Sequence, residues 1–127
     1  MAMFSLALVI DGHPVLGVAY DPFLDRLYAG VTGEPSTCND LPLRVSTLDF
    51  QSGVFVVSSR LRTLAQTAYY QRMINDAVRL TALNGAVYKS CLVARGAFIG
   101  YVEEGVTAHD MAAVHVITEG AGGKITA

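Results

Sequence analysis

The first quarter of the chain consists of apolar runs separated by turn residues. The run from Phe4 to Ile10 predicts a β-strand, and the runs from Val15 to Tyr20 and from Leu27 to Val31 predict further strands. Between the first two runs, Asp11-Gly12-His13-Pro14 has the composition of a turn, because Gly permits positive φ and Pro cannot lie inside a central strand. Strands joined by such short connections predict an antiparallel meander.

From Gly53 onwards, strand-like runs alternate with helical periodicity. Gly53 to Ser58 is a β-rich apolar run of the kind that forms central strands, and Arg60 to Asn75 has helical spacing. The apolar side of this helix would carry Leu61, Leu64, Ala65, Ala68, Tyr69 and Met73. The other expected elements are an edge strand at Leu43–Ser46, a strand at Ala77–Leu80, a helix at Ala82–Ala94 with Thr81 as its N-cap, and a final strand at Lys124–Thr126. This order predicts an α/β (α+β mixed sheet) fold covered by helices, in a single domain over residues 1–127.

The stretch from Ala97 to Gly123 is expected to form a strand, a loop and a helix. The strand ends near Glu103. The helix opens at His109 and Asp110, because an Asp carboxylate accepts hydrogen bonds from the unpaired N–H groups at a helix start. Glu103 and Asp110 would thus lie at the mouth of a strand–loop–helix unit. Ligands bind at this position in open α/β sheets, so the sequence predicts a binding site there.

The composition narrows the possible functions. The chain has 127 residues, a formal net charge of -2 and 52% hydrophobic residues, which suits one domain with ample material for a core. It contains no basic run or patch, which argues against nucleic-acid binding. Its opening residues lack the basic region and cleavage site of a signal peptide and form too short an apolar run to span a membrane. Cys38 and Cys91 are too few for a disulfide scaffold and favour a reducing, cytoplasmic setting.

Several motifs resemble segments of one known family, in the family's order. The C-terminal unit contains Glu103-Glu104-Gly105, His109-Asp110-Met111-Ala112-Ala113 and Glu119-Gly120-Ala121-Gly122-Gly123. The runs from Ile10 to Pro22 and from Cys91 to Gly96 match two further segments. Together they resemble the C-terminal part of the inositol monophosphatase family, which are magnesium-dependent phosphomonoesterases. The resemblance implies the C-terminal portion of that family's layered fold and a hydrolase of inositol phosphate or a related sugar or nucleotide phosphate.

The resemblance also implies roles for particular residues. Asp110 matches a metal-binding Asp, and Glu103 matches an acidic residue that contacts a hydroxyl of the substrate ring. Gly85 and Ala86 fall where the family offers backbone contacts to the substrate. His109 would be a hydrogen-bond donor beside the metal or a group that titrates near neutral pH. From position alone, the alternatives are a helix cap for Asp110, a solvated strand end for Glu103, a loosened helix start for Gly85 and an ordinary surface residue for His109.

One family segment has no counterpart in the sequence. It is Asp-Pro-x-Asp-Gly-Thr, which the resemblance associates with metal and phosphate binding. One Asp cannot hold Mg²⁺ tightly, because this ion is normally shared among several carboxylates and phosphate oxygens. The chain is therefore expected to be truncated relative to the family and weakly active or inactive alone, working with Mg²⁺ as a homo-oligomer or with a complementing N-terminal segment. The alternative is a degenerate, non-catalytic module that associates with a partner through an exposed apolar surface.

Overall fold

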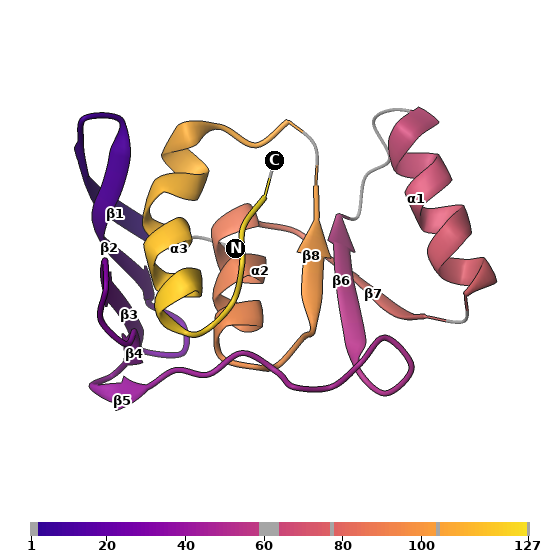
Figure 1. Ribbon diagram of the computed structural model, residues 1–127, viewed down its shortest axis with the longest axis horizontal. Coiled ribbons are helices and arrows are strands. Elements are labelled where there is room, and N and C mark those ends of the chain that lie inside the picture. The colour runs from indigo at the N-terminus through magenta and orange to yellow at the C-terminus, as the bar shows by residue number, and fades with distance from the viewer. Residues whose placement is uncertain (1–2, 59–63, 77, 104, 127) are drawn as a thin grey trace.

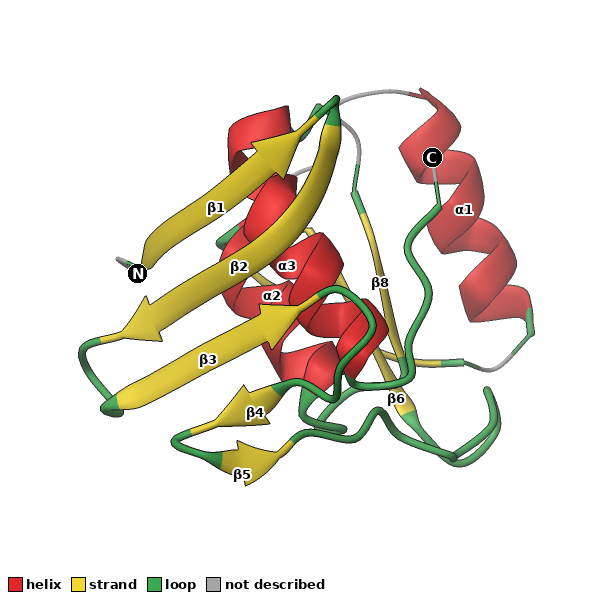
Figure 2. Ribbon diagram, turned by 60° about the vertical axis from the view of Figure 1, so that its left-hand side comes forward, coloured by secondary structure: helices red, strands yellow, loops and turns green. Residues whose placement is uncertain are grey.

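The N-terminal part of the chain forms a five-stranded antiparallel sheet in the order β1-β2-β3-β4-β5 (Figure 2). Its strands are β1 (Phe4–Ile10), β2 (His13–Asp21), β3 (Arg26–Val31), β4 (Thr37–Cys38) and β5 (Leu41–Pro42). The structure is a computed structural model, and it describes residues 3–58, 64–76, 78–103 and 105–126. The first three strands lie where the apolar runs predict them, so the predicted meander is confirmed.

The turn between β1 and β2 is shorter than the sequence suggests. Only Asp11 and Gly12 form it, with φ values of 51° and 77°. His13 and Pro14 instead begin β2, and Pro14 lies opposite Val9 where the register shifts in β1. Pro is tolerated there because such an irregularity does not need its missing N–H group.

A second sheet is parallel and three-stranded, in the order β7-β6-β8. Its strands are β6 (Val54–Ser58), β7 (Arg79–Leu83) and β8 (Gly100–Val102). The predicted central position of β6 is confirmed, because β6 pairs on both sides and most of its residues are buried. Parallel strands of this kind require crossover connections, and helices provide them here.

The helices are α1 (Leu64–Asn75), α2 (Ala86–Ala94) and α3 (Ala108–Gly120). Figure 1 shows α2 and α3 between the two sheets, with α1 on the far side of the parallel sheet. The main core lies where α2 and α3 meet the antiparallel sheet, and it includes Ala19, Tyr28, Cys91, Val114 and Ile117. No helix in the described ranges combines the length and the apolar character that crossing a bilayer would require.

The close approach of α3 to the antiparallel sheet depends on Gly17 of β2. A Cβ atom at this position would collide with the backbone of Ala113 in α3. Because the colliding atoms belong to a helix backbone, they cannot move aside as a flexible side chain would. Gly17 therefore sets the distance between the antiparallel sheet and the helix that begins at the candidate site.

Four expected strands differ from the structure. The strand expected at Ala77–Leu80 is found as β7, which runs from Arg79 to Leu83, and Ala77 lies outside the described residues. Within the part of the chain that the structure describes, the other three lack a neighbouring strand over all or part of their length. Leu43–Ser46 is extended but belongs to neither sheet; its backbone is tied instead by Leu43 N–H to Ser36 O (2.9 Å) and by Val45 N–H to Ala121 O (3.0 Å). The strand expected from Ala97 is shorter and begins at Gly100 as β8. Lys124–Thr126 has no regular secondary structure. In each case the side-chain pattern fits a strand but a neighbouring ladder is missing among the described residues, and strands are defined by such pairing.

The helix boundaries also differ. Thr81 is not an N-cap, because Thr81 and Ala82 pair with Val56 and Val57 as part of β7. Instead α2 begins at Ala86 after Gly85, whose φ of 90° ends the strand. Of the apolar side predicted for the helix at 60–75, Leu61 and the side chains of Leu64 and Ala65 lie outside the described residues. Met73 is half-buried, but Ala68 and Tyr69 are exposed. The prediction that they lie on a buried apolar side is therefore wrong for Ala68 and Tyr69.

Candidate functional site

The candidate site lies at the carboxyl-terminal edge of the parallel sheet. Strands β6 and β7 end at Ser58 and Leu83, and β8 is followed directly by Glu103. Because parallel strands end at the same edge, this topology brings Glu103 and the start of α2 at Gly85 to one side of the sheet. Ligands characteristically bind at this edge in parallel α/β sheets.

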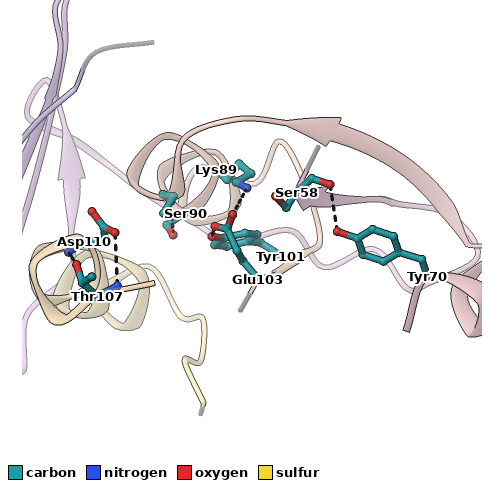
Figure 3. A network of polar contacts seen from close by, with 9 residues as sticks. Ser58, Tyr70, Lys89, Ser90, Tyr101, Glu103, Thr107 and Asp110 are labelled. Atoms are coloured by element: carbon teal, nitrogen blue, oxygen red, sulfur yellow. Dashed lines mark hydrogen bonds and ion pairs between the residues drawn. The ribbon is translucent and has the colours of Figure 1, made fainter. Parts of the chain in front are cut away.

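Glu103 is held by both of its carboxylate oxygens. The Lys89 ammonium nitrogen lies 3.4 Å from Glu103 Oε1, and the Tyr101 hydroxyl donates a hydrogen bond to Glu103 Oε2 (Figure 3). The Lys89 ammonium also lies over the Tyr101 ring, 4.6 Å from its centroid. The side chain of Lys89 is fully buried, whereas that of Glu103 keeps 14% of its surface exposed. Glu103 is therefore a nearly buried, fixed carboxylate and not the solvated strand end that was the alternative.

The electrostatics around Tyr101 connect Glu103 with Asp110. Burial is the largest cause that raises the pKa of the Tyr101 hydroxyl, followed by its hydrogen bond to Glu103 and the negative charges of Glu103 and Asp110. Tyr101 therefore stays protonated at neutral pH and acts as a hydrogen-bond donor. Since both carboxylates act on the same hydroxyl, the structure brings the two predicted acidic site residues into one electrostatic environment.

Asp110 forms a capping box at the start of α3. Its backbone N–H donates to Thr107 Oγ1 (3.4 Å), and its carboxylate accepts from the backbone N–H of Thr107 (3.5 Å). This is the helix-cap role that the position alone suggests. In Figure 3 Asp110 lies beside Thr107 and apart from Lys89 and Glu103. The Asp110 carboxylate thus stabilises the start of α3, independently of any ligand that it binds.

The described ranges contain no group of three or more His, Cys, Asp or Glu side chains placed to hold a metal ion. Mg²⁺ favours octahedral oxygen coordination and loses its water reluctantly, so a single carboxylate is a poor site for it. The residues that the structure describes therefore do not make up a magnesium site by themselves, although Asp110 remains a candidate for one ligand.

The other predicted site residues lie at helix starts. Gly85 is the N-cap of α2 and, lacking a side chain, provides no side-chain cap; its carbonyl accepts a hydrogen bond from Lys89 N–H (3.0 Å). Ala86 is the first residue of α2 and is half-buried. An uncapped helix start is open to acceptors from outside the helix. His109 is exposed in the first turn of α3, which fits the surface alternative.

A cavity of about 580 Å³ opens beside Glu103. Its walls come mainly from α2, β8, α3 and the residues after α3, with further residues from α1, β6 and the segment before β6, and they include Ser90, Tyr101, Met111 and Thr118. The wall is mostly apolar, with Glu103 as its acidic group and Lys124 as its basic group. Glu103 and Tyr101 therefore line the cavity, whereas Asp110 does not.

Lys89 and Tyr101 are not among the residues that the sequence predicts for the site. Lys89 is the charged residue in the apolar stretch Val87–Ala94, and a Lys among residues that are otherwise suited to burial was an available signal. Tyr101 carried no such signal, since a Tyr in a short strand is ordinary. The hydroxyl of Tyr70 in α1 donates to Ser58 O (3.1 Å) at the end of β6.

Comparison with known proteins gives a consistent result. The profile of the inositol monophosphatase family matches residues 4–127. The chain is 33% identical over 127 residues to Nus factor SuhB of Pasteurella multocida, and 32% identical over 130 residues to inositol-1-monophosphatase of Synechocystis. Among solved structures, it is similar to inositol monophosphatase of Anabaena (TM-score 0.84, 29% identity) and to extragenic suppressor protein suhB of Bartonella henselae (TM-score 0.83, 27% identity).

These matches cover nearly the whole chain but only part of each relative. The alignments span 95% and 97% of this chain but 47% and 45% of the Pasteurella and Synechocystis proteins. The structural matches span 94% and 93% of this chain and 50% and 47% of the Anabaena and Bartonella chains. The chain thus corresponds to about half the length of the relatives it matches. On the profile match and the shared fold, the chain belongs to the inositol monophosphatase family.

Proposed function

We propose that this chain is the substrate-binding part of a phosphomonoesterase that hydrolyses an inositol phosphate or a related sugar or nucleotide phosphate. The observation that carries the proposal is the gathering of Glu103 and the open start of α2 at one edge of the parallel sheet, with Asp110 within electrostatic reach. Family membership supports the phosphatase chemistry, because relatives across the family bear the name inositol monophosphatase.

Each site residue has a proposed role. The fixed carboxylate of Glu103 accepts a hydrogen bond from a hydroxyl of the substrate. Backbone N–H groups at Gly85 and Ala86 are aimed at substrate oxygens, since a helix start carries partial positive charge. Asp110 contributes one carboxylate oxygen to a metal ion, and His109 lies next to it on the exposed side of the helix start.

Magnesium is part of this proposal. When bound, the ion would stabilise the negative charge that develops on phosphate oxygens during hydrolysis. Because the described residues do not make up a magnesium site alone, the other ligands must come from a complementing N-terminal segment or from a second copy. We therefore expect the isolated chain to release phosphate weakly or not at all. The free thiols of Cys38 and Cys91 fit a reducing cytoplasm as the place of action.

The test is phosphate release from inositol 1-phosphate, with and without Mg²⁺. It should be run on the chain alone and on the chain mixed with the amino-terminal part of the Synechocystis inositol-1-monophosphatase, the part that this chain does not match. Turnover in the mixture that requires Mg²⁺ and is lost in Asp110→Asn would support the proposal. Absence of turnover, together with no thermal stabilisation of either sample by Mg²⁺ or substrate, would overturn it.

A second function is favoured by a different observation. The side of the antiparallel sheet that faces away from α3 is apolar across all of β1, β2 and β3. We call this surface the outer face; it consists of Phe4, Leu6, Leu8, Leu16, Val18, Tyr20, Leu27, Ala29 and Val31. Contiguous exposed apolar surface of this kind marks association sites. A non-catalytic module that acts through protein association is therefore the alternative, and the relatives named Nus factor show that names in this family are not confined to phosphatases.

A further inference from the structure

Lys89 and Glu103 form a buried ion pair that fold stability does not require. The side chain of Lys89 is fully buried in α2, and within the described residues its ammonium group donates no hydrogen bond. Burying an ion pair is costly, and replacing both of its partners by apolar residues of similar volume is often as stable or more so. The charge of Lys89 is therefore expected to have a role in the neighbouring site and not in stability.

The charge of Lys89 acts on Glu103. At 3.4 Å from Oε1, the ammonium is the counter-ion of the one carboxylate that lines the cavity. Tyr101 holds Oε2 with a neutral hydroxyl, which adds no charge. The cluster thus presents the cavity with a carboxylate whose charge is balanced from the buried side.

This balance decides which ligand groups bind well at Glu103. Each carboxylate oxygen can accept more than one hydrogen bond, so Glu103 can still accept one from a ligand hydroxyl. A ligand ammonium placed at the same position would be attracted to Glu103 but repelled by Lys89 directly behind it. In a medium of effective dielectric constant about 20, the repulsion between unit charges about 6 Å apart is about half of the attraction that a carboxylate exerts at about 3 Å. The attraction that remains is opposed by the cost of taking the ligand ammonium out of water.

We propose that Lys89 is a positioning residue that sets specificity through Glu103, so that the site accepts the hydroxyl of a sugar or polyol phosphate and rejects an ammonium group at that position. This inference rests on the proposed function, because it names the substrate class of the same site. It concerns a side chain that does not touch the ligand and that acts only through the charge it places behind Glu103.

The test compares two ligands that differ at one position. Glucose 6-phosphate carries a hydroxyl where glucosamine 6-phosphate carries an ammonium group. Dissociation constants for both should be measured by calorimetry or NMR titration, with inorganic phosphate as a reference, for the wild-type chain and for Lys89→Met, Lys89→Gln and Lys89→Arg, each mixed with the amino-terminal part of the Synechocystis inositol-1-monophosphatase. The wild type should prefer glucose 6-phosphate. Lys89→Met and Lys89→Gln should shift the affinity ratio toward glucosamine 6-phosphate by about tenfold or more, as expected when a nearby like charge is removed.

The controls separate charge from packing. Lys89→Arg keeps the positive charge and should keep the wild-type preference, and the double variant Lys89→Met/Glu103→Gln should show no preference for the ammonium ligand. Inorganic phosphate should bind all variants equally. If the wild type binds both sugar phosphates and neither uncharged variant changes their ratio, the role of Lys89 is overturned. If the wild type binds neither sugar phosphate nor inositol 1-phosphate, the proposed function is overturned and the specificity assignment falls with it.

Discussion

At the scale of single residues, the pair of Lys89 and Glu103 makes a prediction about stability that is independent of any ligand. Removing one partner of a buried ion pair leaves the other charge without compensation, which costs about 3 kcal/mol or more. Lys89→Met and Glu103→Gln should each lower the free energy of unfolding by about this amount. The double variant should recover much of the loss, because neither charge then remains.

Urea unfolding of the four proteins of this double-mutant cycle measures the coupling. The chain offers a matched control in an exposed pair on α1, because Arg72 and Asp76 lie 3.9 Å apart with both side chains well exposed. Their exchange for neutral residues should change stability by less than about 1 kcal/mol, as is usual for surface pairs. Equal losses in the single and double variants of the buried pair would show that Lys89 contributes packing and not charge.

Two buried groups predict how stability responds to alkali. Burial raises the pKa of the Cys91 thiol from 9.0 to about 12, and burial likewise raises the pKa of Tyr28 from 10.0 to about 12. Between about pH 9 and 12 the folded chain therefore keeps protons that the unfolded chain has lost. Stability should be unaffected by these groups below about pH 9 and should fall above it, with a slope approaching about 1.4 kcal/mol per pH unit for each group.

Urea midpoints measured from pH 8 to 11 would show this decline. Cys91→Ala and Tyr28→Phe should each start from a lower stability at pH 8, since each removes buried atoms, but each should lose less stability as the pH rises. A decline as steep in both variants as in the wild type would assign the alkaline sensitivity to other groups.

At the scale of elements, the Asp110 carboxylate at the start of α3 has a structural role as a helix cap and a proposed role as a metal ligand. Thr107→Ala removes the hydroxyl that accepts Asp110 N–H and should cost about 1 kcal/mol of stability, the usual value of an N-cap. Asp110→Asn keeps a side-chain acceptor for the Thr107 N–H and should cost less. If Asp110 is also a metal ligand, only Asp110→Asn should remove the thermal stabilisation by Mg²⁺ in the complemented protein. Loss of that stabilisation in Thr107→Ala as well would argue that the cap alone matters.

The sequence predicted elements well where local pattern decides the outcome. Strand β1 and the strands after it alternate between the α3 side and the outer face, and short turns separate them, so their positions follow from the period of the side chains. The predicted start of α2 lies too early in the chain, because Thr81 and Ala82 pair with β6 in a parallel ladder. Such pairing joins segments far apart in the chain and leaves no local signal.

The same distinction holds within the site. The positions of Glu103 at a strand end and of Asp110 at a helix start could be predicted, because both depend on local pattern. The partnership of Lys89 with Glu103 depends on how α2 packs against β8, and no pattern within either segment reports that packing. The resemblance to the family implies a role for Glu103 and none for Lys89.

At the scale of the whole molecule, the layers leave one sheet covered on a single side. Helices α2 and α3 separate the two sheets, and the outer face of the antiparallel sheet has no described element over it (Figure 1, Figure 2). On that face, Leu6 is 57% exposed and Phe4 is 58% exposed, on a strand whose second edge is unpaired within the described residues. Apolar faces and open strand edges both favour association. We expect either a second copy or a complementing segment to cover this surface.

The outer face therefore predicts concentration-dependent self-association that charges on this face should prevent. A Lys in place of Leu6, alone or with Leu16→Lys, would put an ammonium group where the sheet meets its partner while leaving the α3 side of each strand unchanged. Sedimentation velocity over a range of concentrations should show larger species for the wild type and monomers for these variants. Leu48→Lys is the matched control, because Leu48 is also 57% exposed but lies in the loop before β6. Equal dissociation by Leu48→Lys, or a wild type that is monomeric throughout, would show that copies of this chain do not cover the outer face, and a complementing segment would then be its expected partner.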